Sequence, residues 1–143
     1  MSPFENSKPI RVAFYIRVST EEQAKDGYWV DMQMQGLKDM MVYKSTHYNW
    51  SHEKKDEYID LWCTGADLNR PQYKRMMEDA KEGRFDIVAV WKIDRLSRNL
   101  SHLLWTFEIL QANKVAFYSL KENVDFSGPI GKLTFQIFGA LAE

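Results

Sequence analysis

The stretch from Val12 to Thr20 constrains the fold most strongly, because an apolar run of strand-forming residues ends there in polar residues and a helix-start signal. Side chains alternate between the two faces of a strand, so Arg17 and Ser19 share one face where the strand ends. The opposite face is apolar and carries Val12, Phe14, Ile16 and Val18. A hydroxyl beside a guanidinium that stays protonated is suited to attack on a phosphate.

A structural explanation of Ser19 stays open beside this chemical one. Ser19 with Glu22, or Thr20 with Gln23, fits the S/T-x-x-E/Q pattern in which a hydroxyl caps a helix N-terminus. A serine between a strand and a helix is more often a cap than a nucleophile. The local pattern alone therefore favours the cap, and the rest of the chain must decide.

Length and composition are typical of one soluble globular domain. The chain has 143 residues and no apolar run long enough to span a bilayer. Its N-terminus lacks the basic start and apolar block of a signal peptide, and Cys63 is its one cysteine. We therefore expect a cytoplasmic protein. A net charge of −1 excludes a broadly basic surface, so any affinity for DNA would come mostly from elsewhere.

The succession of elements predicts an α/β sandwich of three layers around a mostly parallel sheet. Strands are expected over residues 10–18, 58–63, 86–92 and 114–120, and helices over 30–44, 71–83, 100–110 and from 129 onward, with a short helical turn near 21–28. Pro71 at the first helical position makes Arg70 the N-cap. The segment 44–57 has no clear period and is interpreted as an exposed loop, in which His47 and His52 face solvent.

Polar segments follow three strands of this predicted sheet. Parallel α/β sheets bind ligands at the carboxyl ends of their strands, and Ser19, the segment 64–70 and the segment 94–98 all fall there. Arg95 and Arg98 are three residues apart, so on a helical turn they would face the same way. A phosphate would offset their mutual repulsion, although pairing with surface carboxylates explains them equally well.

The segment from Gly128 onward predicts a helix that is apolar on two sides, which favours packing against another subunit. No stop signal precedes Glu143, so we expect the helix to continue in a longer protein. The expected organisation is a flexible lead-in over 1–9, a catalytic α/β domain over 10–128 and the truncated start of a long interface helix over 129–143.

The order of these motifs resembles the catalytic domain of the serine recombinases, the resolvase/invertase superfamily. The resemblance covers residues 10–143 and is carried by Tyr15-Ile16-Arg17-Val18-Ser19-Thr20, Gln23, Gly27-Tyr28, Asp31-Met32-Gln33, Thr64-Gly65, Arg70-Pro71 and Lys92-Ile93-Asp94-Arg95-Leu96-Ser97-Arg98. The Gly27-Tyr28 and Arg70-Pro71 steps are most similar to the large integrase and transposase members. Trp29, Val30 and Met32 depart from the family pattern, and we expect them to alter the surface and assembly rather than the chemistry.

The resemblance implies that Ser19 attacks a DNA phosphodiester, leaving a 5′-phosphoseryl link and a free 3′ hydroxyl. It implies that four arginines hold the phosphate and that three further residues support the site; these are Arg17, Arg70, Arg95 and Arg98, with Gln23, Gln33 and Asp94. It also implies strand exchange and religation in a homo-oligomer, from dimer to tetramer, with DNA as the partner, no membrane, no metal and no cofactor. DNA-binding domains would lie outside this chain.

The implied chemistry is physically coherent, because several arginines around one phosphate can activate a hydroxyl and neutralise the transferring group without a metal. Two other functions stay open from the residues. A small phosphoester hydrolase with a flavodoxin-like fold would share the arginine pocket but turn over small phosphates. An anion-binding module would use Ser19 as a helix cap and perform no chemistry.

Overall fold

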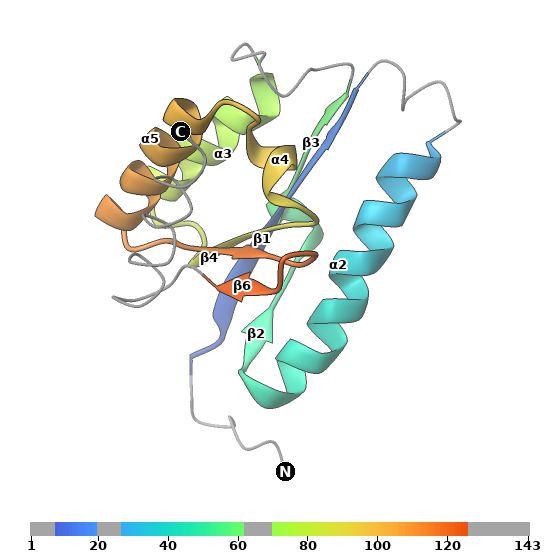
Figure 1. Cartoon of the computed structure of the whole chain (residues 1–143). Coiled ribbons are helices and arrows are strands. Elements are labelled where there is room, and N and C mark those ends of the chain that lie inside the picture. The colour runs from blue at the N-terminus through green and yellow to red at the C-terminus, as the bar shows by residue number, and fades with distance from the viewer. Residues whose placement is uncertain (1–7, 20–26, 62–69, 126–143) are drawn as a thin grey trace.

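The computed structural model describes residues 8–19, 27–61 and 70–125. Its strands and helices alternate along the chain, as Figure 1 shows. The strands are β1 (Ile10–Val18), β2 (Trp50–Ser51), β3 (Glu57–Leu61), β4 (Ile87–Val90), β5 (Ala116–Ser119) and β6 (Val124–Asp125). The helices are α2 (Tyr28–His47), α3 (Pro71–Lys81), α4 (Ile93–Leu96) and α5 (Leu100–Ala112), with a 3-10 turn, η1, over Lys54–Asp56.

The strand β1 is the centre of the sheet. One edge of β1 pairs with β2 near its start and with β3 along its second half, where Arg17 lies opposite Asp60. The other edge pairs with β4, followed by β5, and all these pairings are parallel. Only the short strand β6 runs antiparallel, beside β5. This arrangement confirms the predicted, mostly parallel sheet and places the carboxyl ends of β1, β3 and β4 at one end of it.

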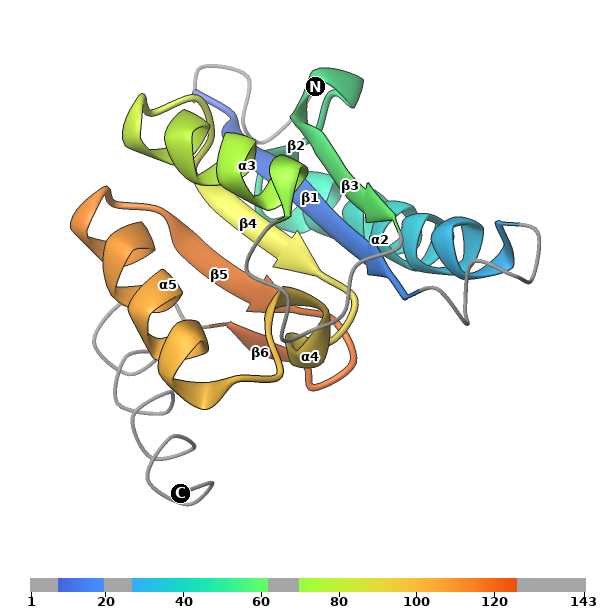
Figure 2. The same cartoon turned by 90° about the horizontal axis from the view of Figure 1, so that it is seen from above.

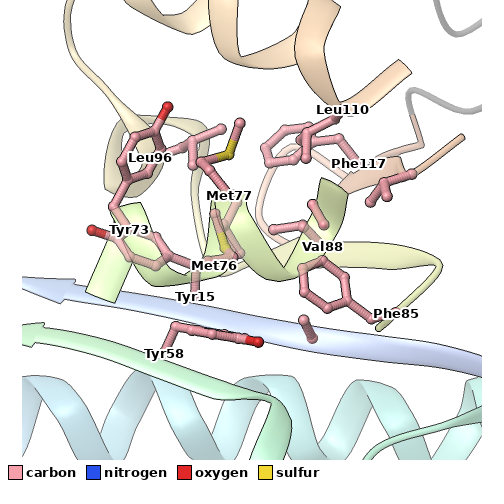
Figure 3. Close-up of a cluster of buried hydrophobic side chains, with 14 of the residues drawn as sticks. Tyr15, Tyr58, Tyr73, Met76, Met77, Phe85, Val88, Leu96, Leu110 and Phe117 are labelled. Atoms are coloured by element: carbon pink, nitrogen blue, oxygen red, sulfur yellow. The ribbon is translucent and has the colours of Figure 1, made fainter. Parts of the chain in front are cut away.

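The helices cover the sheet on both faces, which confirms the three layers (Figure 2). The helix α2 covers the face on which Val12, Phe14, Ile16 and Val18 lie, and Leu37 and Met40 of α2 join that core. The helices α3 and α5 cover the other face, where Tyr15 packs against Tyr73 and Met76. Figure 3 shows this second core, with Leu110 and Phe117 at its far side. The alternation predicted for β1 is therefore confirmed.

The helix α3 begins as predicted, with Arg70 in extended conformation at the N-cap and Pro71 in the first turn. Its predicted buried stripe is confirmed, since Tyr73, Met76, Met77 and Ala80 are all buried. Gly83 follows the helix with a φ of 73°, a left-handed conformation that a glycine adopts without a Cβ penalty.

The prediction of a loop over 44–57 is wrong. The helix α2 continues to His47, and the strand β2, the turn η1 and the start of β3 follow. The last turn of α2 is exposed, and the hydroxyls of Ser45 and Thr46 donate hydrogen bonds to the carbonyl of Val42. Because polar contacts rather than an apolar stripe stabilise this helix end, the sequence of residues 44–47 shows no apolar helical periodicity.

The solvent-facing interpretation holds for His47, which is exposed, and is wrong for His52. The ring of His52 stacks on Phe14 with centroids 3.5 Å apart. Its Nδ1 donates to the carbonyl of Val12 at 2.8 Å, and its Nε2 lies 3.0 Å from a carboxylate oxygen of Glu57. His52 is thus a structural residue that fastens the β2–β3 segment to β1.

An ion pair fastens the start of β1 to the turn after α3. The carboxylate of Asp86 accepts hydrogen bonds from the backbone N–H of Arg11 at 2.9 Å and from its guanidinium at 3.2 Å. Burial would raise the pKa of Asp86, but the hydrogen bonds from Arg11 outweigh it and hold that pKa below its ordinary value. A carboxyl with a lowered folded-state pKa stabilises the fold above its unfolded-state pKa and loses this contribution as the pH falls through the folded value.

We expect Asp86→Asn to lower the free energy of unfolding by about 1 kcal/mol at pH 7, because the pair is partly exposed. The difference from the wild type should shrink as the pH falls below about 4, where the wild-type carboxyl also becomes protonated. Urea unfolding at pH 7, 5 and 3 measures this, with Asp39→Asn on the exposed surface of α2 as the control. An equal cost of Asp86→Asn at pH 3 and pH 7 would contradict the prediction.

Candidate active site

The candidate nucleophile Ser19 directly follows β1 and is half-buried. Two residues before it, Arg17 is buried within the same strand, with 1% of its surface exposed. The turn α4, which follows β4, lies against β1 at this end of the sheet. Segments that are far apart in the sequence therefore meet at the carboxyl end of β1, as the parallel topology predicts.

The guanidinium of Arg17 is bonded to the α4 turn. Its Nη2 donates to the carbonyl of Asp94 at 2.7 Å, and its Nε donates to the carbonyl of Arg95 at 3.1 Å. Arg95 returns the contact, because its Nη1 donates to the backbone carbonyl of Arg17 at 3.1 Å. This reciprocal exchange fixes the two arginines relative to each other.

The helix α2 adds a third donor to the same carbonyl. Gln33 is fully buried, and its Nε2 donates to the carbonyl of Arg17 at 3.2 Å. The structure thus brings Gln33 next to Arg17, as a supporting role requires. Gln23, the other predicted glutamine, lies outside the described residues.

The third arginine, Arg70, reaches the site from the N-cap of α3. It is fully buried, and its Nη1 donates to the hydroxyl of Tyr15 at 3.1 Å. Its guanidinium carbon lies 4.5 Å from the ring centroid of Tyr73. Its Nε and Nη2 are buried and have no hydrogen-bond partner among the residues that the structure describes. A buried guanidinium with two unsatisfied N–H groups is costly, and an anion that accepts both would remove the cost.

A buried carboxylate that sequence reasoning missed holds this arginine in place. Asp60 of β3 accepts hydrogen bonds from the hydroxyl of Tyr15 at 2.8 Å and from the backbone N–H groups of Gln72 and Tyr73 at 2.9 Å. It therefore satisfies the first turn of α3 and, through Tyr15, orients Arg70. An acidic residue between the apolar Ile59 and Leu61 was the sequence signal that could have revealed it.

The electrostatics of the site reflect the gathering of positive charge. Burial lowers the pKa of the Arg17 guanidinium, and the nearby charges of Arg95, Arg70 and Arg98 lower it further. Burial and the carboxylate of Asp60 raise the pKa of the Tyr15 hydroxyl, so it stays a neutral donor to Asp60. Backbone carbonyl groups hold Arg17, and the hydroxyl of Tyr15 holds Arg70. These neutral acceptors do not cancel the charge of either guanidinium.

The prediction that Arg95 and Arg98 face the same way is wrong. The turn α4 ends at Leu96, and Ser97 has an extended backbone, so the helical spacing is broken between the two arginines. As a result Arg95 is buried, with 6% of its surface exposed, whereas Arg98 is exposed. Arg98 lines a surface pocket with Asp94 and Ser97.

Asp94 is also positioned mainly through its backbone. Its carbonyl accepts from Arg17, while its carboxylate lies 3.8 Å from the Nε of Arg95 with 41% of its side chain exposed.

Within the described ranges, no group of three or more His, Cys, Asp or Glu side chains could hold a metal ion. None of the helices in that same part of the chain is long and apolar enough to cross a membrane.

Residues 12–143 match the family described as "Resolvase, N terminal domain". The chain is 33% identical to the transposon Tn917 resolvase of Enterococcus faecalis over 129 residues, which cover 90% of this chain and 59% of that resolvase. It is 32% identical to a probable DNA-invertase, y4cG, of Sinorhizobium fredii, over 93% of this chain and 37% of the invertase. The chain thus spans only part of the length of these relatives.

Two solved structures share the fold and a third of the sequence. The N-terminal catalytic domain of TP901-1 integrase superposes with a TM-score of 0.79 at 35% identity, covering 92% of this chain and 93% of that domain. A resolvase family site-specific recombinase from Streptococcus pneumoniae gives a TM-score of 0.75 at 32% identity, covering 93% of this chain and 85% of that one. The chain therefore belongs to the resolvase family of serine recombinases, in which it matches the N-terminal catalytic domain.

Proposed function

We propose that this domain cuts and rejoins DNA for a site-specific recombinase, with Ser19 as the nucleophile. The observation that carries the proposal is the fully buried Arg70, whose Nε and Nη2 have no hydrogen-bond partner within residues 8–19, 27–61 and 70–125. It lies at the same end of the sheet as Arg17 and Arg95, beside the strand that leads to Ser19. A phosphodiester carries one negative charge and two non-bridging oxygens that can accept from such donors.

In the proposed reaction, the Oγ of Ser19 attacks the phosphorus of a DNA phosphodiester. An Oγ–P bond forms, the bond from phosphorus to the 3′ oxygen breaks, and the hydroxyl proton ultimately leaves on the 3′ hydroxyl. Arg17, Arg70 and Arg95 stabilise the extra negative charge of the crowded transition state. Religation reverses these steps, so the phosphoseryl bond preserves the energy of the original linkage.

The proposal assigns roles to the remaining predicted residues. Arg98, which is exposed and lines a surface pocket beside Asp94, would approach the phosphate when DNA binds. Gln33 and Asp94 would keep Arg17 in place, and Gln23 would support the site from outside the described residues. The substrate would be DNA bound mainly by parts of the protein beyond this chain, and the acting form a homo-oligomer, dimer to tetramer, in the cytoplasm.

Replacing Ser19 tests the nucleophile. We expect the complete protein to form a denaturant-resistant adduct with its DNA site, and Ser19→Ala to abolish the adduct because no other hydroxyl replaces the Oγ. Gel electrophoresis under denaturing conditions measures it, with Ser101→Ala, an exposed serine of α5, as the matched control. An undiminished adduct in Ser19→Ala would exclude this nucleophile.

The same variant separates the other two functions. A small phosphoester hydrolase would release phosphate from a generic phosphomonoester in a Ser19-dependent way, without a DNA adduct. If the domain is an anion-binding module with Ser19 as a cap, Ser19→Ala would cost about 1 kcal/mol of stability and leave recombination by the complete protein intact. We expect neither result.

Removing the hydroxyl of Tyr15 tests the support of Arg70. We expect Tyr15→Phe to slow DNA cleavage about tenfold or more, because Arg70 loses an acceptor that orients it. Single-turnover cleavage measures this. Tyr58→Phe is the matched control, since Tyr58 is equally buried and its hydroxyl also donates to an aspartate, Asp79, at 2.6 Å. Equal cleavage rates for the two variants would contradict the role of Tyr15.

A further inference from the structure

Two tryptophans lie around the buried Arg95. Its guanidinium carbon is 5.8 Å from the ring centroid of Trp29 and 5.5 Å from that of Trp91. The two rings contact each other edge to face, with centroids 6.4 Å apart and an interplanar angle of 64°. Trp29 comes from the first turn of α2, and Trp91 from the connection between β4 and α4.

Two glycines of this region support the arrangement, Gly27 through its backbone conformation and Gly36 through its small size. Gly27 has a φ of 77° and turns the chain into α2, which places Trp29 in the first turn. A Cβ at Gly36, two turns further along α2, would lie 3.6 Å from the ring of Trp91 and 3.4 Å from Leu120. A side chain larger than alanine at Gly36 would press on Trp91, so the small residue lets the helix pack on this ring.

Trp91 is held from the other side as well. Its backbone carbonyl accepts a hydrogen bond from the N–H of Lys121 at 2.9 Å. The ammonium groups of Lys92 and Lys121 lie 5.5 and 5.4 Å from its ring centroid. The ring is therefore fixed between α2, the α4 turn and the turn after β5, which makes it a rigid surface for Arg95.

We propose that Trp29 and Trp91 are positioning residues that hold Arg95 by cation–π attraction, ready for the phosphate. An aromatic ring attracts a guanidinium through its electron-rich face, and tryptophan does so most strongly. This attraction uses none of the N–H donors that a phosphate needs, unlike a hydrogen bond to a carboxylate. The inference rests on the proposed function and replaces the expectation that Trp29 alters the surface and assembly rather than the chemistry.

Fluorinated tryptophans at position 29 test the electrostatic part of this proposal. Each added fluorine withdraws electron density from the ring face and changes its size little. In the complete protein we expect the single-turnover rate of Ser19-dependent DNA cleavage to fall stepwise, by about two- to tenfold across the series. The affinity for uncut DNA and the thermal midpoint should stay constant. The same series at Trp105, which is 53% exposed on α5, is the matched control and should leave the rate unchanged.

A second measurement does not depend on activity. The 19F resonance of 5-fluorotryptophan at position 29 should shift in Arg95→Met, because the cation over the ring is lost, and should stay in place in Arg84→Met, an exposed arginine after α3. A 19F resonance insensitive to Arg95→Met would overturn the proposed cation–π contact between Trp29 and Arg95. So would a flat rate series at position 29 while Ser19-dependent cleavage continues. Absence of that cleavage in the wild type would overturn the proposed function instead, whatever the 19F result.

Discussion

Burying arginine side chains without cancelling their charge is the constraint on which the rest of this structure depends. An unpaired buried cation costs several kcal/mol, so the fold must supply contacts that keep it in place. For Arg70 these contacts are the hydroxyl of Tyr15 and the faces of two tyrosine rings. Asp60 stands one hydrogen bond further away and stabilises the assembly without pairing directly with the guanidinium. An anionic substrate would balance the positive charge that remains.

The parallel sheet makes this arrangement possible. Because β3 and β4 run beside β1 in the same direction, α3 and α4 both begin at the end where Ser19 lies. Asp60 then serves the fold and the site together, since it satisfies the first N–H groups of α3 and fixes Tyr15. A variant at Asp60 would therefore mix a loss of stability with a loss of activity, whereas Tyr15→Phe leaves in place the hydrogen bonds that Asp60 accepts from the first turn of α3.

Local patterns in the sequence were sufficient for β1 and for the start of α3. Alternation of side chains placed Val12, Phe14, Ile16 and Val18 in one core, and Pro71 placed Arg70 at the N-cap. The facing of Arg95 and Arg98 was predicted wrongly, because the spacing argument assumed a continuous helical turn, whereas α4 ends at Leu96 and Ser97 is extended. Tyr15 and Asp60 are 45 residues apart in the sequence, and Trp29 and Trp91 come from separate elements. No local periodicity in the sequence reveals either contact.

The three buried arginines, Arg17, Arg70 and Arg95, are held by chemically different groups. This difference affects how each guanidinium can respond to a phosphate. Arg17 donates to two backbone carbonyls, which move only if the α4 turn moves. Two N–H groups of Arg70 have no acceptor in the described part of the chain, so an anion could accept from them without displacing a contact seen there. Arg95 donates to the carbonyl of Arg17 and lies beside the rings of Trp29 and Trp91, which occupy none of its N–H donors. In the proposed reaction Arg70 would therefore bind the phosphate first, while Arg17, fixed by the α4 turn, and Arg95, held over the rings, would stabilise the charge that develops.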